Sequence, residues 1–185
     1  MTAYRIVAVA MLAAVGTAWA QDSGREIRDS LAEKLDVFNL CPVEERVDLF
    51  VDELPEHAAN AGLTTKAVRE AIESRLRGAR LHDRSAGPLL HARFAIGVPE
   101  EGHVPFYSIE ISFLRELFAE RAGLFALAET WSTAGSGQGD ADSFLAHLDG
   151  LVGEFIAEHV RVRGTRACIE LRRQAAAGAK SPGSG

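Results

Sequence analysis

Alternating apolar and polar residues along the chain predict β-strands. Every second residue is apolar in residues 47–51, 90–98 and 107–113, the pattern of a strand with one buried face. Residues 124–131 are apolar on both faces and read as a further strand, and residues 79–82 as a brief edge strand. Because the turns between successive strands are short, we expect mostly antiparallel pairing.

Two other segments have apolar residues three or four positions apart, which is typical of amphipathic helices. The first follows Thr64, a good N-cap residue, and ends near Gly78. The second begins at Asp140 or Asp142 and runs to His159. The predicted buried stripes are Val68, Ala71, Ile72 and Leu76 in the first helix, and Phe144, Leu148, Leu151, Val152, Phe155, Ile156 and His159 in the second.

Four remaining segments have less regular patterns. A capping-box spacing near the start predicts a helix over residues 24–35. Residues 133–139 are rich in glycine and serine, which predicts a loop. Residues 165–173 fit a strand or a helix equally well, and the small residues after residue 174 predict a disordered tail.

The order of these elements is strand, helix, up to four strands, helix. It predicts an α+β fold: a mainly antiparallel or mixed sheet of four to five strands, with two main helices packed on one face. We divide the chain into a signal peptide (1–20), a partly helical N-terminal segment (21–43), one α+β domain (44–173) and a disordered tail (174–185).

The first twenty residues have the layout of a secretory signal peptide. Arg5 precedes an apolar run over residues 6–15, and Ala18 and Ala20 are the small residues that signal peptidase recognises. We expect cleavage between Ala20 and Gln21. The apolar run is shorter than the roughly 20 residues of a membrane span. No cysteine follows the cleavage site directly, so we expect a periplasmic or secreted chain without a lipid anchor.

The chain has two cysteines, Cys41 and Cys168, which lie 127 positions apart. In an oxidising compartment this even number favours one disulfide. Catalytic redox pairs usually lie close together as Cys-x-x-Cys, so a structural bridge is the preferred interpretation. The alternative, a redox protein, predicts an exposed and easily reduced bond.

The net charge of −6 argues against nucleic acid as a partner, because such binding depends on neutralising phosphates. Basic residues nevertheless concentrate near the C-terminus, where Arg161, Arg163 and Arg166 are candidate contacts for a protein partner. Trp131 is a further candidate, since it closes an apolar strand beside the glycine-rich segment. The alternative for Trp131 is packing between sheet and helix.

Known catalytic and cofactor-binding motifs are absent from the sequence. The stretch from Gly135 to Gly139 lacks the third glycine of G-x-G-x-x-G, a position held by Asp140, so we do not expect nucleotide binding. No two histidines have the i, i+4 spacing of metal ligands on a helix, and we expect neither metal nor cofactor. The nucleophile motifs Gly-x-Ser-x-Gly and Ser-x-x-Lys do not occur. The six histidines are His57, His82, His91, His103, His147 and His159.

The element order, the Gly62-Leu63-Thr64 entry into the first helix and the strand ending Glu129-Thr130-Trp131 resemble a group of small uncharacterised exported bacterial proteins. The architecture is similar to α/β accessory domains of cell-envelope machines, such as the N-terminal domain of the Tol translocation protein. The resemblance covers roughly residues 45–160 and implies a domain that binds other proteins.

Two functions follow from these observations as hypotheses. The first is a non-catalytic accessory factor that binds another cell-envelope protein. The second is a small-molecule-binding protein or hydrolase with a site between the sheet and the glycine-rich segment. The second predicts a deep pocket with converging polar groups such as His91, His103 and Asp140.

Overall fold

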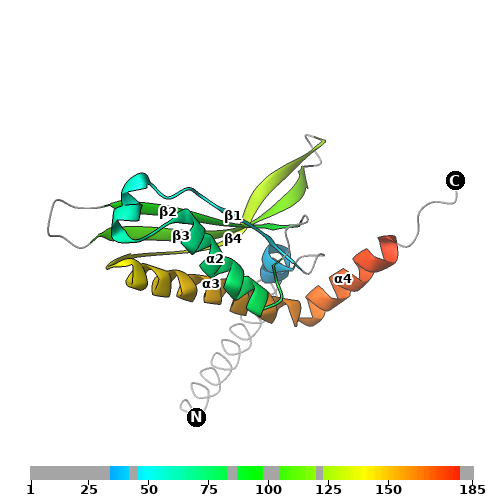
Figure 1. Ribbon diagram of the computed structural model, residues 1–185. Coiled ribbons are helices and arrows are strands. Elements are labelled where there is room, and N and C mark those ends of the chain that lie inside the picture. Colours follow the sequence, from blue (N-terminus) through cyan, green and yellow to red (C-terminus); the bar gives the residue numbers. More distant parts are fainter. Residues whose placement is uncertain (1–33, 42–45, 83–86, 98–104, 120–122, 180–185) are drawn as a thin grey trace, which may run out of the picture.

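The computed structural model describes residues 34–41, 46–82, 87–97, 105–119 and 123–179 (Figure 1). Residues 34–40 are helical, and the other elements follow in the order strand, helices, three strands and two helices. Their bounds are β1 Asp48–Val51, the 3-10 helix η1 Glu56–Ala61, α2 Thr65–Gly78, β2 Leu89–Gly97, β3 Phe106–Ala119, β4 Leu124–Gln138, α3 Ala141–Arg163 and α4 Arg166–Ala179.

The sheet is four-stranded, in the order β1-β2-β3-β4. β1 and β2 are parallel, with α2 in the connection between them, and the other two pairs are antiparallel. A parallel pair needs a long crossover, which the segment containing α2 provides. Helices α2 and α3 pack against the sheet and each other. The predicted α+β fold with a mixed sheet is therefore confirmed.

The core lies between the sheet and these two helices. Alternation along β3 buries Tyr107, Ile109, Ile111 and Phe113, as the sequence pattern predicts. Both predicted helix starts are confirmed by capping hydrogen bonds. Thr64 accepts from the amide of Ala67, and Asp140 accepts from the amide of Ser143. The residues of the predicted helix stripes that are buried are Val68, Ile72, Leu76, Phe144, Leu148, Leu151, Val152, Phe155 and His159.

The glycine-rich segment is not the predicted loop, because β4 continues through it to Gln138. Its glycines do not form a turn but allow neighbouring side chains to pack closely on the strand. The ring of His147 occupies the space where a side chain on Gly135 would lie. The hydroxyl oxygen of Tyr107 lies 2.8 Å from the position that a Cβ on Gly137 would take. The strand therefore needs glycine to let β3 and α3 pack tightly beside it.

Gly137→Val should lower the free energy of unfolding by about 1–3 kcal/mol, because the new side chain displaces buried Tyr107. The displacement also breaks the hydrogen bond that the Tyr107 hydroxyl donates to the carbonyl of Ser143. Urea unfolding measures the loss. Ser136→Val, one residue away on the exposed side of the strand, is the control and should change stability by less than about 0.5 kcal/mol. Equal stability of both variants would contradict the packing role of Gly137.

Three other segments can be compared with their sequence patterns. The predicted edge strand at residues 79–82 is a single bridge between His82 and Val47. For residues 165–173, left open between strand and helix, the structure has a helix, since α4 begins at Arg166. The same helix continues to Ala179, into the segment for which the sequence predicts a disordered tail.

The β3–β4 hairpin is longer than the sequence pattern predicts. Residues 114–119 of β3 and 124–130 of β4 continue past the core as a two-stranded ribbon (Figure 1). The ribbon begins at a β-bulge, where the register shifts between Phe113 and Leu114 of β3 and Thr130 of β4 is the extra residue. The ribbon is therefore a separate surface beyond the helices.

The disulfide between Cys41 and Cys168 is present, as predicted. Both cysteines are completely buried, and their Cα atoms lie 5.7 Å apart. The bond joins the segment before β1 to the first turns of α4. Its burial contradicts the exposed bond that the redox hypothesis predicts and agrees with a structural bridge.

Candidate functional site

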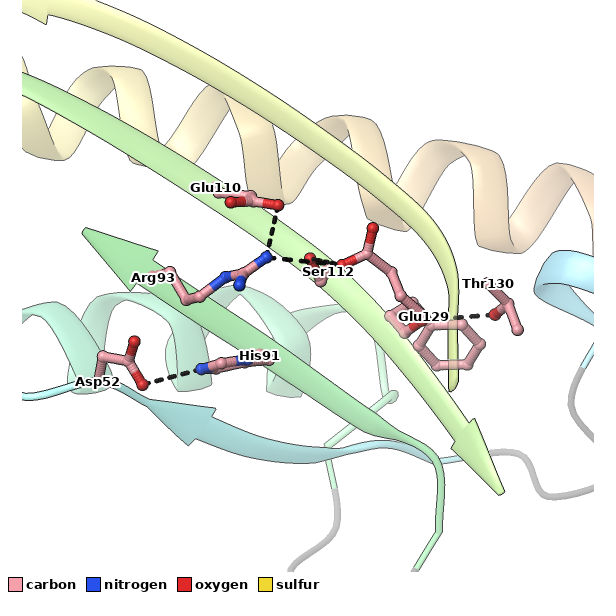
Figure 2. Close-up of polar contacts among 8 residues, drawn as sticks. Asp52, His91, Arg93, Glu110, Ser112, Glu129 and Thr130 are labelled. Atoms are coloured by element: carbon pink, nitrogen blue, oxygen red, sulfur yellow. Dashed lines mark hydrogen bonds and ion pairs between the residues drawn. The ribbon is translucent and has the colours of Figure 1, made fainter. Parts of the chain in front are cut away.

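The face of the sheet opposite α2 and α3 carries polar and charged side chains, and we call it the open face. Along β2, His91 and Arg93 lie on this face, while their neighbours in sequence pack toward the helices. In the register of the sheet, His91 lies opposite Ser112 and Arg93 opposite Glu110 (Figure 2). Small exposed residues complete the open face toward the other end of the strands: Ala95, Ser108, Ala134 and Ser136.

Arg93 lies at the centre of an ion-pair network on the open face (Figure 2). Its guanidinium lies 2.7 Å from a carboxylate oxygen of Glu110 and 3.6 Å from one of Glu129. Ser112 donates a 2.6 Å hydrogen bond to the same oxygen of Glu129. That bond lowers the pKa of Glu129, with smaller contributions from Ser132 and Arg93. Glu129 is therefore held as a carboxylate.

The β-bulge brings Glu129 into this network. Its extra residue, Thr130, shifts the register so that Glu129 lies opposite Leu114, next to Ser112 on the open face. The Thr130 hydroxyl donates a 2.8 Å hydrogen bond to the carbonyl of Asn39 in the helical segment before β1. The bulge is thus fixed by a contact with a distant part of the chain.

His91 belongs to a second polar group at the β1 side of the open face. Its Nε2 lies 2.8 Å from a carboxylate oxygen of Asp52 (Figure 2). The centroid of its ring lies 5.2 Å from that of Phe50. With Ser112 opposite His91, the group contains the residue types of a hydrolytic triad. However, the Ser112 hydroxyl donates to Glu129, and Ser112 is only 1% exposed. Because Ser112 is buried, a substrate cannot reach its hydroxyl, which is bonded to Glu129 rather than to His91.

Large apolar side chains flank the polar network. Phe50 and Phe106 are about half exposed, and the Phe106 ring lies over Gly97. On the ribbon, Phe125 is 65% exposed and Leu127 is 60% exposed. Strand alternation from Glu129 places both on the same side of the ribbon as the open face. The open face therefore combines charged and exposed apolar groups.

The hydrolase hypothesis places a pocket beside the glycine-rich segment, and the geometry there does not match it. Asp140 caps α3, and hydrogen bonds from Ser143 lower the pKa of its carboxyl. His91 lies on the open face, and His103 is outside the described residues. A cavity of about 420 Å³ lies elsewhere, between β1 and α2, and is lined by Asp48, Leu49, Arg69, Glu73 and His82.

The histidines that the structure describes make separate contacts. His57 donates a hydrogen bond from Nε2 to the carbonyl of Ile96, and the ring of His147 packs over Gly135. In the described part of the chain, no group of three or more His, Cys, Asp or Glu side chains is arranged to hold a metal ion.

His159 is buried in the core of the domain. Its ring centroid lies 5.4 Å from that of Phe155 and 5.9 Å from that of Phe113. Neither ring nitrogen has a hydrogen-bond partner among the residues that the structure describes. Burial, with added repulsion from Arg163 and Arg172, lowers the pKa of His159 to about 4. This histidine is a neutral core residue rather than a ligand.

The predicted partner contacts lie away from the open face. The guanidinium of Arg161 lies 2.6 Å from a carboxylate oxygen of Glu158 and 2.7 Å from one of Asp36, and these contacts raise its pKa. Arg166 is exposed in α4. Arg163 lies in the last turn of α3. The Trp131 ring packs 5.4 Å from that of Phe155, between β4 and α3. Packing is therefore the better interpretation of Trp131.

Sequence reasoning missed Arg93, Glu110 and Glu129 as a group. The signal was the charged residues at alternate positions of neighbouring strands, such as Arg93 and Glu110. Their meeting depends on strand register, which the alternation alone does not give.

The predicted signal peptide and its cleavage site at Ala20 and Gln21 lie outside the described residues. Among the residues that the structure describes, no helix has both the length and the apolar character needed to cross a membrane.

The chain has little similarity to known proteins. No protein-family model and no curated protein matches the chain. Among solved structures, it is similar to a minor lipoprotein from Acinetobacter baumannii, with 12% identity and a TM-score of 0.31. The match covers 63% of this chain and 92% of that one. A TM-score this low does not establish a common fold, so the evidence about function is the geometry of the open face.

Proposed function

We propose that the protein is a non-catalytic accessory factor of the bacterial cell envelope, and that it binds another envelope protein through the open face. The observation that carries the proposal is the exposure of Phe125 and Leu127 beside the Arg93 network. Exposed apolar side chains rimmed by polar groups mark interaction sites, because a partner removes them from water.

The charges of the open face define the chemistry of the partner. Glu110, Glu116 and Glu129 lie on this side of β3 and β4, and Arg93 pairs with two of them. The face therefore carries more negative than positive charge. A surface that presents apolar and basic side chains is its complement.

The disulfide supports a location outside the cytoplasm. Structural disulfides persist in oxidising compartments such as the periplasm and are rare in the cytosol. The buried bond between Cys41 and Cys168 fits that environment. Together with the signal peptide expected over residues 1–20, it supports a periplasmic or secreted protein.

Binding is favoured over hydrolysis by the position of Ser112. Its hydroxyl is buried and donates to Glu129, so Ser112 is not available to the nearby Asp52–His91 pair as a nucleophile. The same contacts suit a binding surface, because they hold the charged groups of the open face in fixed positions.

A cross-linked pull-down of the tagged protein from its own cell envelope, read by mass spectrometry, tests the proposal. We expect one dominant co-purifying protein. Phe125→Ser/Leu127→Ser should reduce its recovery at least about tenfold, as expected when central apolar contacts of an interface are lost. Both side chains are largely exposed, so the variant should fold normally.

Ile169→Ser/Leu171→Ser is the matched control, because it removes two exposed apolar side chains from α4 instead. The control should capture the partner as the wild type does. Loss of capture with Arg161→Ala/Arg163→Ala/Arg166→Ala, with the ribbon variant unaffected, would move the binding site to the C-terminal helices. Absence of any specific partner would contradict the accessory role.

A further inference from the structure

Residues 131–138 of β4, beyond the bulge, lack the features that usually prevent an edge strand from pairing. In the part of the chain that the structure describes, no strand pairs with the outer edge of β4. Natural edge strands are commonly protected by charged residues, proline, bulges or very short length. Residues 131–138 are all in extended β4, beyond the bulge, and contain no charged residue and no proline. This part of the edge can accept another strand.

Helix α3 lies along the same part of β4. His147 packs over Gly135, and Glu154 accepts a 2.9 Å hydrogen bond from Thr133. Gly150 is three residues from His147 and four from Glu154, so it lies on the same side of the helix, level with Ala134 of the strand. A Cβ added to Gly150 would have no neighbour within 4 Å. Space therefore remains beside α3 where the strand edge is open.

We propose that two copies of this chain pair through the outer edges of their β4 strands, antiparallel, around a two-fold axis at Ala134. This would join two four-stranded sheets into one of eight strands. The proposal is independent of the proposed function, which uses the open face rather than the edge. A two-fold axis requires the contact surface to be self-complementary.

The residues that this register brings together are compatible. Ser132 lies opposite Ser136 of the second copy, and Thr133 opposite Gly135, so only small, uncharged side chains meet near the axis. Farther out, Trp131 lies opposite Gly137, which adds no side chain of its own to the contact. Because residues 131–138 contain no charged side chain, no like charges face each other across this contact.

The helices of the two copies also fit one another. Helix α3 contacts both β3 and β4, so two such helices on a continuous sheet lie beside each other. Helices pack at about 8–10 Å, which a glycine at the closest approach permits. Antiparallel packing about Gly150 brings His147 of one copy to the level of Glu154 of the other. A protonated histidine and a glutamate carboxylate attract each other.

Sedimentation velocity of the purified protein over a range of concentrations tests the proposal. We expect a reversible dimer. Ala134→Lys places two lysines opposite each other at the axis and should raise the dissociation constant about tenfold or more. Ser108→Lys is the matched control, because it adds the same charge on the same face of the sheet but on β3, away from the edge. It should leave the dimer intact.

Hydrogen exchange gives a second measurement that needs no variant. The amides of residues 131–138 that point away from β3 should gain protection as concentration rises, while those of the ribbon should not. A protein that stays monomeric at high concentration would overturn the proposal, and so would a dimer that tolerates Ala134→Lys. Loss of the dimer in both lysine variants would place the contact on the open face instead. Circular dichroism confirms that both variants are folded.

Discussion

Replacing Cys41 and Cys168 with alanine lowers the free energy of unfolding by up to about 5 kcal/mol, because the chain-entropy model predicts that gain for a loop of this size. The bond closes a loop with a sequence separation of 127 residues, which encloses the sheet, α2 and α3. Without the bond the unfolded chain regains the freedom of that loop. Alanine avoids placing a new polar group at two fully buried positions.

Urea unfolding of the oxidised protein, the reduced protein and the double variant measures the effect. The reduced protein and the variant should unfold at similar, much lower urea concentrations than the oxidised protein. A loss below about 1 kcal/mol would show that the bond constrains little of the unfolded chain. Single alanine variants are unsuitable controls, because each leaves a free thiol that can pair with another molecule.

Burial of His159 makes the protein less stable in acid by about 3 kcal/mol between pH 7 and pH 4. The pKa of His159 is lowered to about 4 in the folded protein, below the ordinary value of 6.5. Only the unfolded state therefore binds a proton in this range. The contribution of His159 is fully present above pH 6.5 and is lost as the pH falls toward 4.

His159→Leu should remove this part of the acid sensitivity, because leucine fills the site between Phe113 and Phe155 without a titratable group. The measurement is the free energy of unfolding at pH 7 and at pH 4.5 for both proteins, so that effects of other titrating groups cancel. His147→Gln, which removes a partly exposed histidine from the same helix, is the control and should keep the wild-type dependence. If the free energy of unfolding falls equally between pH 7 and pH 4.5 in the wild type and in His159→Leu, the burial argument is contradicted.

The local elements could be predicted from the sequence where one pattern dominates. The alternation at Val47, Leu49 and Val51 identifies β1, and the caps at Thr64 and Asp140 identify two helix starts. Each depends on interactions within a few residues. The fold class then follows from the order of the elements.

The errors and omissions arise from tertiary contacts. Glycine at positions 135 and 137 favours a turn locally, and the reason for it, contact with His147 and Tyr107, is visible only in the packed structure. Glu129 reaches Ser112 only because of the bulge at Thr130. The candidate site was therefore less predictable than the fold, since it depends on register and on a bulge.

The position of the disulfide has a consequence for a chain exported as we propose. Cys41 precedes β1, and Cys168 lies in α4, after every other element of the domain. During translocation from the N-terminus, Cys41 reaches the oxidising side long before Cys168. The native bond therefore closes only when nearly the whole domain has emerged. Until then Cys41 is available for mixed disulfides with the cell's thiol oxidases, which makes correct pairing a late step of maturation.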